Sequence, residues 1–178
     1  DAIKEEALIE INNLFESSAF ILGEQVDAFE KKFSSWNNST FSVGVSNGTD
    51  GLEIAARSLN MKDRSAVFIP ANTFIATFIG IYKVYPNADY YLVDCDDSYL
   101  MNVDVLENVL SQVSDNYDNL LVVPVHLYGA TVDMQKLMYL KSIFGFYIIE
   151  DCSQAHGAIS NTGKFVGNDG DVNVFSLD

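Results

Sequence analysis

Residues 146–157 read FYIIEDCSQAHG, and this stretch decides the fold. An apolar run at 146–149 ends at once in the charged pair Glu150 and Asp151, which a small polar segment follows. Such a run is typical of a buried strand in a parallel sheet, and ligands bind where those strands end. We therefore predict a strand at 146–149, with Asp151 just beyond its carboxyl end.

Similar apolar runs recur along the chain, and amphipathic helical patterns separate most of them. The other predicted strands are 41–46, 66–69, 89–93, 120–125 and 172–176, and the predicted helices are 2–16, 24–36, 52–59, 73–84, 103–113 and 133–144. This alternation predicts an α/β domain whose mostly parallel sheet carries helices on both faces. We see no repeat or interdomain linker, so we expect one domain over residues 1–178.

Composition narrows the classes of partner. Hydrophobic residues make up 48% of the chain, which is typical of a globular protein. The net charge of −15 and only ten basic residues argue against nucleic-acid binding, which needs clustered Lys and Arg. No apolar run approaches the roughly 20 residues of a membrane span. The start, DAIKEEALIEI, does not resemble a signal peptide. We expect a cytoplasmic protein in which Cys95 and Cys152 are buried, reduced thiols.

The segment SNGTDG, residues 46–51, follows a predicted strand and opens a helix. Gly48 permits close approach of a ligand, and Thr49 and Asp50 fall in the first helical turn, where unpaired N–H groups attract anions. The functional interpretation is a phosphate site. The structural alternative is an ordinary helix cap by Asn47, Thr49 or Asp50.

In YIIEDCSQAHG, residues 147–157, the carboxylate of Asp151 can keep a pyridine nitrogen protonated, and Gln154 can bond a substituent of the same ring. A metal site built from Glu150, Asp151, His156 and His126 is a second interpretation, although no metal-binding spacing supports it. A helix-capping aspartate is a third.

Three other segments follow predicted strands. PANTFIAT, residues 70–77, offers Asn72 or Thr73 as a helix cap and Phe74 as a ring that either stacks on a planar cofactor or packs in the core. In VHLYG, residues 125–129, a lone His126 is more often structural than catalytic. DVNVFS, residues 171–176, ends in Ser176, a phosphate ligand or a turn residue.

Taken in order, these motifs resemble the DegT/DnrJ family of nucleotide-sugar aminotransferases, which have the type I fold of enzymes that use pyridoxal 5'-phosphate (PLP). The matching segments are GEQVDAFEKKFSSW, GVSNGTDGLEIAARSL, PANTFIAT, VPVHLYGATVDM, IIEDCSQAHGA and GDVNVFS. The resemblance implies that residues 1–178 are the N-terminal part of the PLP-binding large domain. PANTFIAT with VHLYG is most similar to enzymes that aminate a 3-keto-6-deoxyhexose carried on dTDP.

The resemblance also implies a role for each position. The PLP phosphate would bind Gly48, Thr49, Asp50 and Ser176. Phe74 would stack on the ring, Asp151 would pair with the ring nitrogen, Gln154 would contact the 3-hydroxyl, and His156 would face the sugar. The expected partners are a nucleotide sugar and an amino donor, L-glutamate, in a homodimer; no metal is expected.

Two departures from the family pattern matter. Leu177 stands where the family usually has an aromatic residue, and the lysine that binds PLP is expected about one helical turn after Ser176, past Asp178. Relatives with histidine at that position dehydrate the sugar instead, so a dehydratase stays an alternative. So do a catalytically incomplete fragment and a generic nucleotide-binding domain, although the glycine-rich turn lacks a dinucleotide fingerprint.

Overall fold

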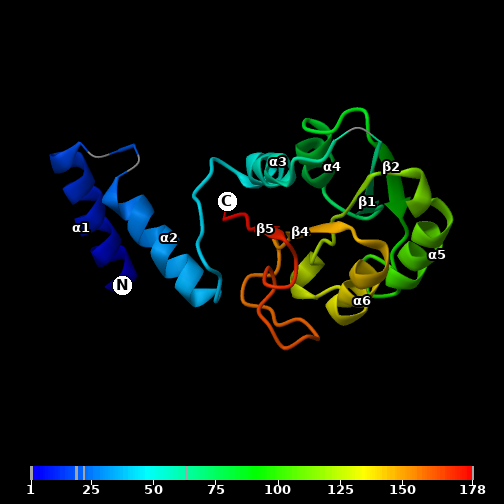
Figure 1. The fold of residues 1–178 in the computed structure, drawn as a ribbon. Helices are drawn as coiled ribbons and strands as arrows, with labels where there is room; N and C mark the ends of the chain where they lie inside the picture. Colours follow the sequence, from blue (N-terminus) through cyan, green and yellow to red (C-terminus); the bar gives the residue numbers. More distant parts are fainter. Residues whose placement is uncertain (1, 19, 22, 63, 178) are drawn as a thin grey trace. The chain divides into compact units, whose positions relative to one another are not determined.

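The computed structural model describes residues 2–18, 20–21, 23–62 and 64–177, which form two compact units, 1–44 and 45–178 (Figure 1). The prediction that both belong to one large domain stays a prediction. Within the described ranges, no helix combines the length and apolar character needed to cross a membrane.

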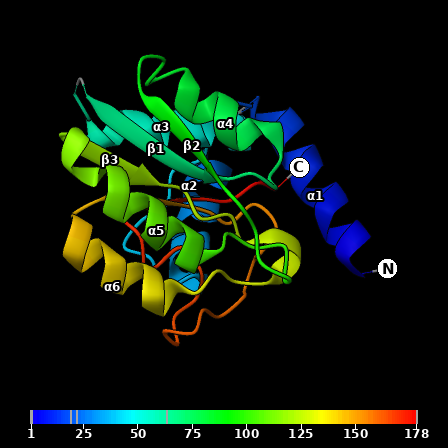
Figure 2. The same ribbon diagram turned by 90° about the vertical axis from the view of Figure 1, so that its right-hand side faces the viewer.

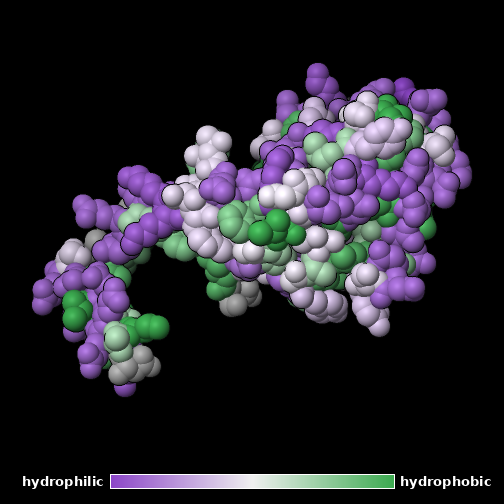
Figure 3. All heavy atoms as spheres, turned by 90° about the horizontal axis from the view of Figure 1, so that it is seen from below, coloured by the Kyte–Doolittle hydropathy of each residue, from purple (hydrophilic) through white to green (hydrophobic). Residues whose placement is uncertain are grey.

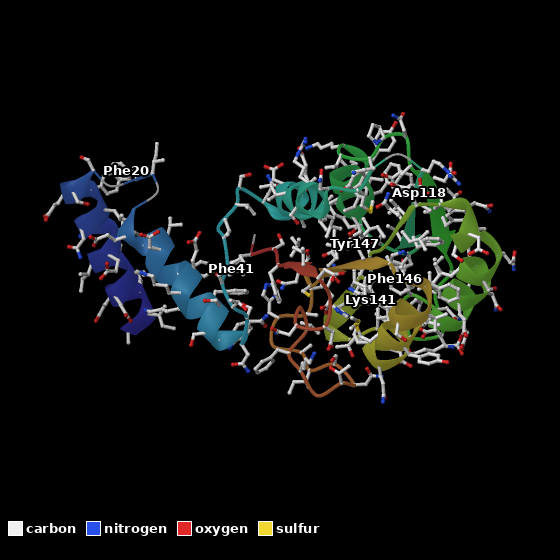
Figure 4. All side chains as sticks on the ribbon, in the orientation of Figure 1. Phe20, Phe41, Asp118, Lys141, Phe146 and Tyr147 are labelled. Carbon is white, nitrogen blue, oxygen red and sulfur yellow. The ribbon has the colours of Figure 1, made fainter. Side chains whose placement is uncertain are left out.

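The first unit contains two helices, α1 (Ala2–Ser17) and α2 (Glu24–Trp36), close to the bounds that the sequence predicts. None of the described residues of α1 is buried, and its apolar side chains lie exposed among charged ones (Figure 3). On α2, the ring of Phe33 lies 5.6 Å from that of Phe29 and 5.5 Å from that of Trp36. Phe20 and Phe41, which lie outside the two helices, are also exposed (Figure 4).

The strand predicted at 41–46 is wrong, because the segment pairs with none of the described strands. A strand needs a neighbour to bond its backbone groups. Here the segment bonds to α2 instead: the backbone N–H of Gly44 donates to the Glu30 carboxylate over 2.6 Å, and the side-chain hydroxyl of Ser42 donates to the Glu30 carbonyl over 2.6 Å. The alternation of apolar residues thus reflects an extended connector.

The second unit contains a five-stranded, wholly parallel sheet in the order β2-β1-β3-β4-β5. Its strands are β1 (Ser65–Pro70), β2 (Asp89–Val93), β3 (Asn119–Val122), β4 (Tyr147–Asp151) and β5 (Val172–Val174). Its helices are α3 (Gly48–Leu59), α4 (Ile75–Tyr82), α5 (Val103–Val113) and α6 (Met134–Phe144), with short 3-10 turns η1 (Ser114–Asn116) and η2 (Leu127–Gly129). β3 is shorter than predicted because Pro124 has no N–H to give to a ladder.

Helices cover both faces of the sheet, as predicted (Figure 2). Alternate residues of β1 point to opposite sides, so Phe68 packs with the core residues of α5 and α6 while Val67 packs with those of α3 and α4. The other strands divide in the same way. Burial of a side chain such as Phe68 contributes about 1.5–3 kcal/mol to stability.

The start of β4 is tied to its neighbours by charge as well as by packing. The Phe146 ring is buried, and Lys141 of α6 forms an ion pair with Asp171, whose carboxylate also accepts the Ile148 N–H over 2.7 Å (Figure 4). These contacts fix β4 in the sheet and therefore fix the position of the residues at its carboxyl end.

Two glycines bring α3 against its neighbours. A Cβ on Gly80 of α4 would lie 2.7 Å from Cβ of Leu52 and 2.9 Å from the Thr49 carbonyl, and one on Gly51 would lie 2.8 Å from Val174. Only a residue without a side chain fits at these contacts. The close packing places the first turn of α3 beside the end of β5.

The two cysteines differ from each other. Cys152 is buried as predicted, and burial, with the nearby Glu150 and Asp151, raises the pKa of its thiol well above the usual value. Cys95 is partly exposed, so the prediction of a second buried thiol is wrong. It follows β2, which lies at the edge of the sheet and, among the described strands, pairs with β1 alone.

Candidate functional site

The polar segments singled out in the sequence converge at one edge of the sheet. Because the five strands are parallel, all their carboxyl ends face the same way. Residues 71–77, 123–132, 152–157 and 175–176 begin at this edge, and the close packing of α3 brings its first turn there too.

Asp151, the last residue of β4, is held by its backbone from both sides. Its N–H donates to the Pro124 carbonyl over 2.9 Å, and its carbonyl accepts from the His126 N–H over 3.0 Å. The next residue, Cys152, donates to the Val174 carbonyl over 2.8 Å. Asp151 therefore sits between the extension of β3 and the end of β5, with 4% of its surface exposed.

The Asp151 carboxylate accepts three hydrogen bonds. Its Oδ2 accepts from the Thr77 hydroxyl over 2.8 Å, and its Oδ1 accepts from the Ser153 hydroxyl over 2.7 Å and the Ser153 N–H over 3.2 Å. Each carboxylate oxygen accepts about two bonds, so Oδ2 has room for one further donor. The Ser153 contacts form a local turn, which replaces the helix cap considered as an alternative.

The first turn of α3 forms the second part of the site. Asn47 caps the helix, and the first helical bond runs from the Gly51 N–H to the Asn47 carbonyl over 3.0 Å. The amides of Gly48 and Thr49 precede that bond and point out of the helix start. A Cβ on Gly48 would lie 3.3 Å from Oγ of Ser176, so the predicted phosphate residues lie side by side.

Asp50 lies in the same turn, but its polar groups bond within the protein. Its N–H donates to the Asn47 side chain over 2.9 Å, and its carboxylate accepts from Ser46 and Asn47 and lies 3.9 Å from Lys83. Direct contact of Asp50 with a phosphate stays a prediction. These bonds show how the residue can instead hold the turn in shape.

Phe74 is 71% exposed and is the N-cap residue of α4, not part of its first turn. Capping by Asn72 or Thr73 is therefore wrong: the side chain of Asn72 donates to the Tyr99 carbonyl, and that of Thr73 bonds the Thr77 hydroxyl over 2.9 Å. A large exposed ring at the ligand edge is a surface on which a planar group can stack.

Gln154 is oriented by the loop after β3. Its Oε1 accepts the Tyr128 N–H over 3.0 Å, so its NH₂ group is the donor that it can present to a ligand. Tyr128 has a left-handed backbone (φ 57°) and is 74% exposed. His156 is exposed and packs against the Phe175 ring at 5.2 Å.

The four residues considered as metal ligands do not come together. The described group within ligand distance is instead His126, Glu150 and Cys152, all buried. The Val132 N–H donates to Nδ1 of His126 over 3.2 Å, so Nε2 carries the proton and donates to Glu150 over 3.1 Å. With both ring nitrogens engaged, the group is structural, as expected for His126.

Two residues of this arrangement had no role in the sequence prediction, Thr77 and Ser153, and a third, Glu150, was considered only as a metal ligand. Thr77 follows Thr73 by four residues, the spacing of one helix face, and Ser153 follows Asp151 by two, the spacing of an aspartate turn. Both spacings are visible in the sequence, but they are too common to identify these residues. Glu150 is recognised only from its partners in space.

Comparison with known proteins finds relatives that are named as sugar aminotransferases. It is 37% identical over 94% of its length to "dTDP-3-amino-3,6-dideoxy-alpha-D-galactopyranose transaminase" of Aneurinibacillus thermoaerophilus. It is 35% identical over 98% of its length to "UDP-N-acetyl-3-dehydro-alpha-D-glucosamine 3-aminotranferase" of Acidithiobacillus ferrooxidans. The structure of S. venezuelae DesV matches 93% of the chain with a TM-score of 0.82 at 27% identity.

The chain covers 44% and 46% of the two curated relatives and 43% of DesV, so it spans less than half of their length. Aminotransferases of the DegT/DnrJ/EryC1/StrS family depend on PLP. The model of the DegT/DnrJ/EryC1/StrS aminotransferase family matches residues 1–177, and the chain therefore belongs to that family.

Proposed function

We propose that the full-length protein is a PLP-dependent aminotransferase that moves an amino group from L-glutamate to a nucleotide-linked keto sugar. Membership of the family and the names of both curated relatives support this activity. When bound, PLP supplies an electron-withdrawing ring that takes up an amino group from one substrate and gives it to another.

The observation that carries the proposal is the carboxylate of Asp151. It is almost fully buried at the ligand edge, accepts three hydrogen bonds, and keeps one acceptor position on Oδ2. A buried carboxylate with an open acceptor position suits a ligand N–H that carries positive charge. A protonated ring nitrogen is such a donor, so the site fits this part of PLP.

The surrounding residues fit the rest of the cofactor. The amides of Gly48 and Thr49 with the Ser176 hydroxyl suit a phosphate at a helix start, and a side chain on Gly48 would crowd that space. The exposed Phe74 offers a face to the ring, and the NH₂ of Gln154 offers a donor to the 3-oxygen. In this role Asp151 holds the proton on the ring nitrogen.

For the sugar substrate we propose a dTDP-linked 3-keto-6-deoxyhexose. The names of the two curated relatives both place the transferred amino group at carbon 3 of the sugar, although one sugar is linked to dTDP and the other to UDP. His156, exposed beside Phe175, is the residue that we expect to face the sugar. An assay that compares dTDP- and UDP-linked 3-keto sugars tests the choice of nucleotide.

We also propose that the full-length enzyme is a cytoplasmic homodimer. The apolar residues of α1 support an association of this kind, because none of the described α1 residues is buried while Ile3 and Phe15 are 78% and 67% exposed. Light scattering on the full-length protein measures the mass, and a monomer at micromolar concentration would refute the dimer.

The activity is tested through the cofactor. The full-length protein should show a visible absorbance band of bound PLP, and Asp151→Ala should lose it because the ring nitrogen loses its partner. Asp115→Asn, on the exposed turn η1, is the matched control and should keep the band. A full-length protein that takes up no PLP would refute the proposal.

A further inference from the structure

Asp151 is connected to a second buried polar group, Thr77, that lies 74 residues away in the sequence. Thr77 is 1% exposed, and its hydroxyl donates to Oδ2 of Asp151 over 2.8 Å. This is the same oxygen that keeps an acceptor position. The other oxygen, Oδ1, accepts both of its bonds from Ser153.

The direction of the hydrogen bonds follows from chemistry. An ionised carboxylate only accepts, so Thr77 must use its single proton for Asp151. The Thr73 hydroxyl, 2.9 Å from that of Thr77, must then be the donor to it. The order Thr73 to Thr77 to Asp151 is therefore fixed, and each bond polarises and strengthens the next.

The same short segment also presents Phe74. This residue stands between Thr73 and the first residue of α4, and Thr77 lies one helical turn further on. The start of α4 thus carries the exposed ring of Phe74 and, through Thr77, also bonds the Asp151 carboxylate. The distance between the stacking face and the acceptor oxygen is set within a single element.

We propose that Thr77 is a positioning residue that aims Oδ2 of Asp151 at the ring nitrogen of the cofactor, with Thr73 as its relay. The inference rests on the proposed function, because the proposed cofactor supplies the N–H donor for the open acceptor position of Oδ2. Thr77 holds the carboxylate rotation and adds to the stabilisation of its negative charge. It touches no part of the cofactor itself.

The test compares two ligands that bind without a covalent bond. One is pyridoxamine 5'-phosphate, and the other is its analogue with C–H in place of the ring nitrogen. Calorimetry on the full-length protein gives both dissociation constants. The dissociation constant of the analogue divided by that of pyridoxamine 5'-phosphate measures the contribution of the nitrogen alone. Changes that merely loosen the fold weaken both ligands and leave the ratio unchanged.

Thr77→Val keeps the shape of the side chain and removes the hydroxyl, and we expect it to reduce the wild-type ratio about tenfold. Thr77→Ser keeps the hydroxyl and should stay within about twofold of wild type. An unchanged ratio in Thr77→Val, or an equal loss in Thr77→Ser, would overturn the inference.

A further variant keeps the test decisive if Thr77→Val does not fold. Thr73→Val removes only the relay and should reduce the ratio about threefold, because the bond from Thr77 remains but is weaker. An unchanged ratio in Thr73→Val would refute the relay, and if Thr77→Val does not fold it would refute the inference as well. Wild-type protein that binds neither ligand would instead overturn the proposed function and this inference with it.

Discussion

Glu150 and Asp151 are neighbours on one strand, yet their carboxylates are surrounded in opposite ways. Side chains of consecutive strand residues point to opposite faces. Glu150 is fully buried and accepts four bonds: from His126 over 3.1 Å, and from the amides of Gly167, Asp169 and Gly170 over 2.8, 2.9 and 2.5 Å. Asp151 accepts three and keeps one position open.

The difference separates a carboxylate that holds the fold from one that, as we propose, binds a ligand. All acceptor positions of Glu150 are taken, so it can do nothing but fasten residues 167–170 to the sheet. The open position of Asp151 has a cost in stability unless a donor fills it. A buried carboxylate is therefore a candidate site only when its hydrogen-bond count is incomplete.

The strongest test of this comparison is Glu150→Gln. The new NH₂ group would face N–H donors, which leaves buried polar groups unpaired. We expect a loss of about 3–5 kcal/mol in the free energy of unfolding. Urea unfolding followed by circular dichroism measures it. A loss below about 1 kcal/mol would show that Glu150 does not fasten the loop.

The reciprocal change is Asp151→Asn. It should weaken binding of pyridoxamine 5'-phosphate about 100-fold, because the charged partner of the ring nitrogen is lost. The free energy of unfolding should change by less than about 1 kcal/mol, since the Asn carbonyl can keep the bonds from Ser153 while its NH₂ group donates to the Thr77 hydroxyl, which, unlike a backbone N–H, can also accept. Calorimetry and urea unfolding give the two values. Large losses in both would place Asp151 with Glu150 as a structural residue.

The pH dependence sharpens the same contrast. Burial alone would raise the pKa of Glu150, but the bonds from His126 and the backbone amides outweigh it and lower the pKa below its usual value. The unfolded chain therefore takes up the proton first, so this stability is present above about pH 4.3 and is lost as the pH falls through the lower folded pKa. Urea midpoints between pH 7 and 3.5 should fall more steeply for wild type than for Glu150→Gln. Parallel curves would contradict the shift.

Much of this arrangement could be predicted from sequence, for a physical reason. Hydrophobic periodicity reports which face of an element is buried, so α2, β2 and α5 have the predicted bounds. Strand ends report where a parallel sheet binds ligands, which is why Ser176 lies at that edge, whereas Gly48 follows no strand and reaches Ser176 through the close packing of α3. The family resemblance added roles that periodicity cannot supply.

The features that sequence could not predict depend on which residues come together in the folded chain. The segment 41–46 has the pattern of a strand but no neighbour among the described strands, and pattern alone cannot supply one. The four donors of Glu150 come from residues 17 to 24 positions away in the chain. No local signal marks such contacts, so periodicity and spacing could not separate Glu150 from Asp151, and only the family resemblance gave Asp151 a role of its own.

The smallest expected effect concerns the loop that Glu150 holds. Within it, the buried Asp169 accepts from Ser160 and Thr162 and pairs with Lys164 over 3.0 Å. The Lys164 side chain is 55% exposed, so solvent screens its charge, and Asp169 keeps its bonds from Ser160 and Thr162; Lys164→Met should therefore cost about 0.5 kcal/mol in urea unfolding. Lys31→Met on α2 is the matched control and should cost nothing measurable. A loss of 2 kcal/mol or more in Lys164→Met would mean that the ion pair, rather than Glu150 and the backbone amides, holds the loop.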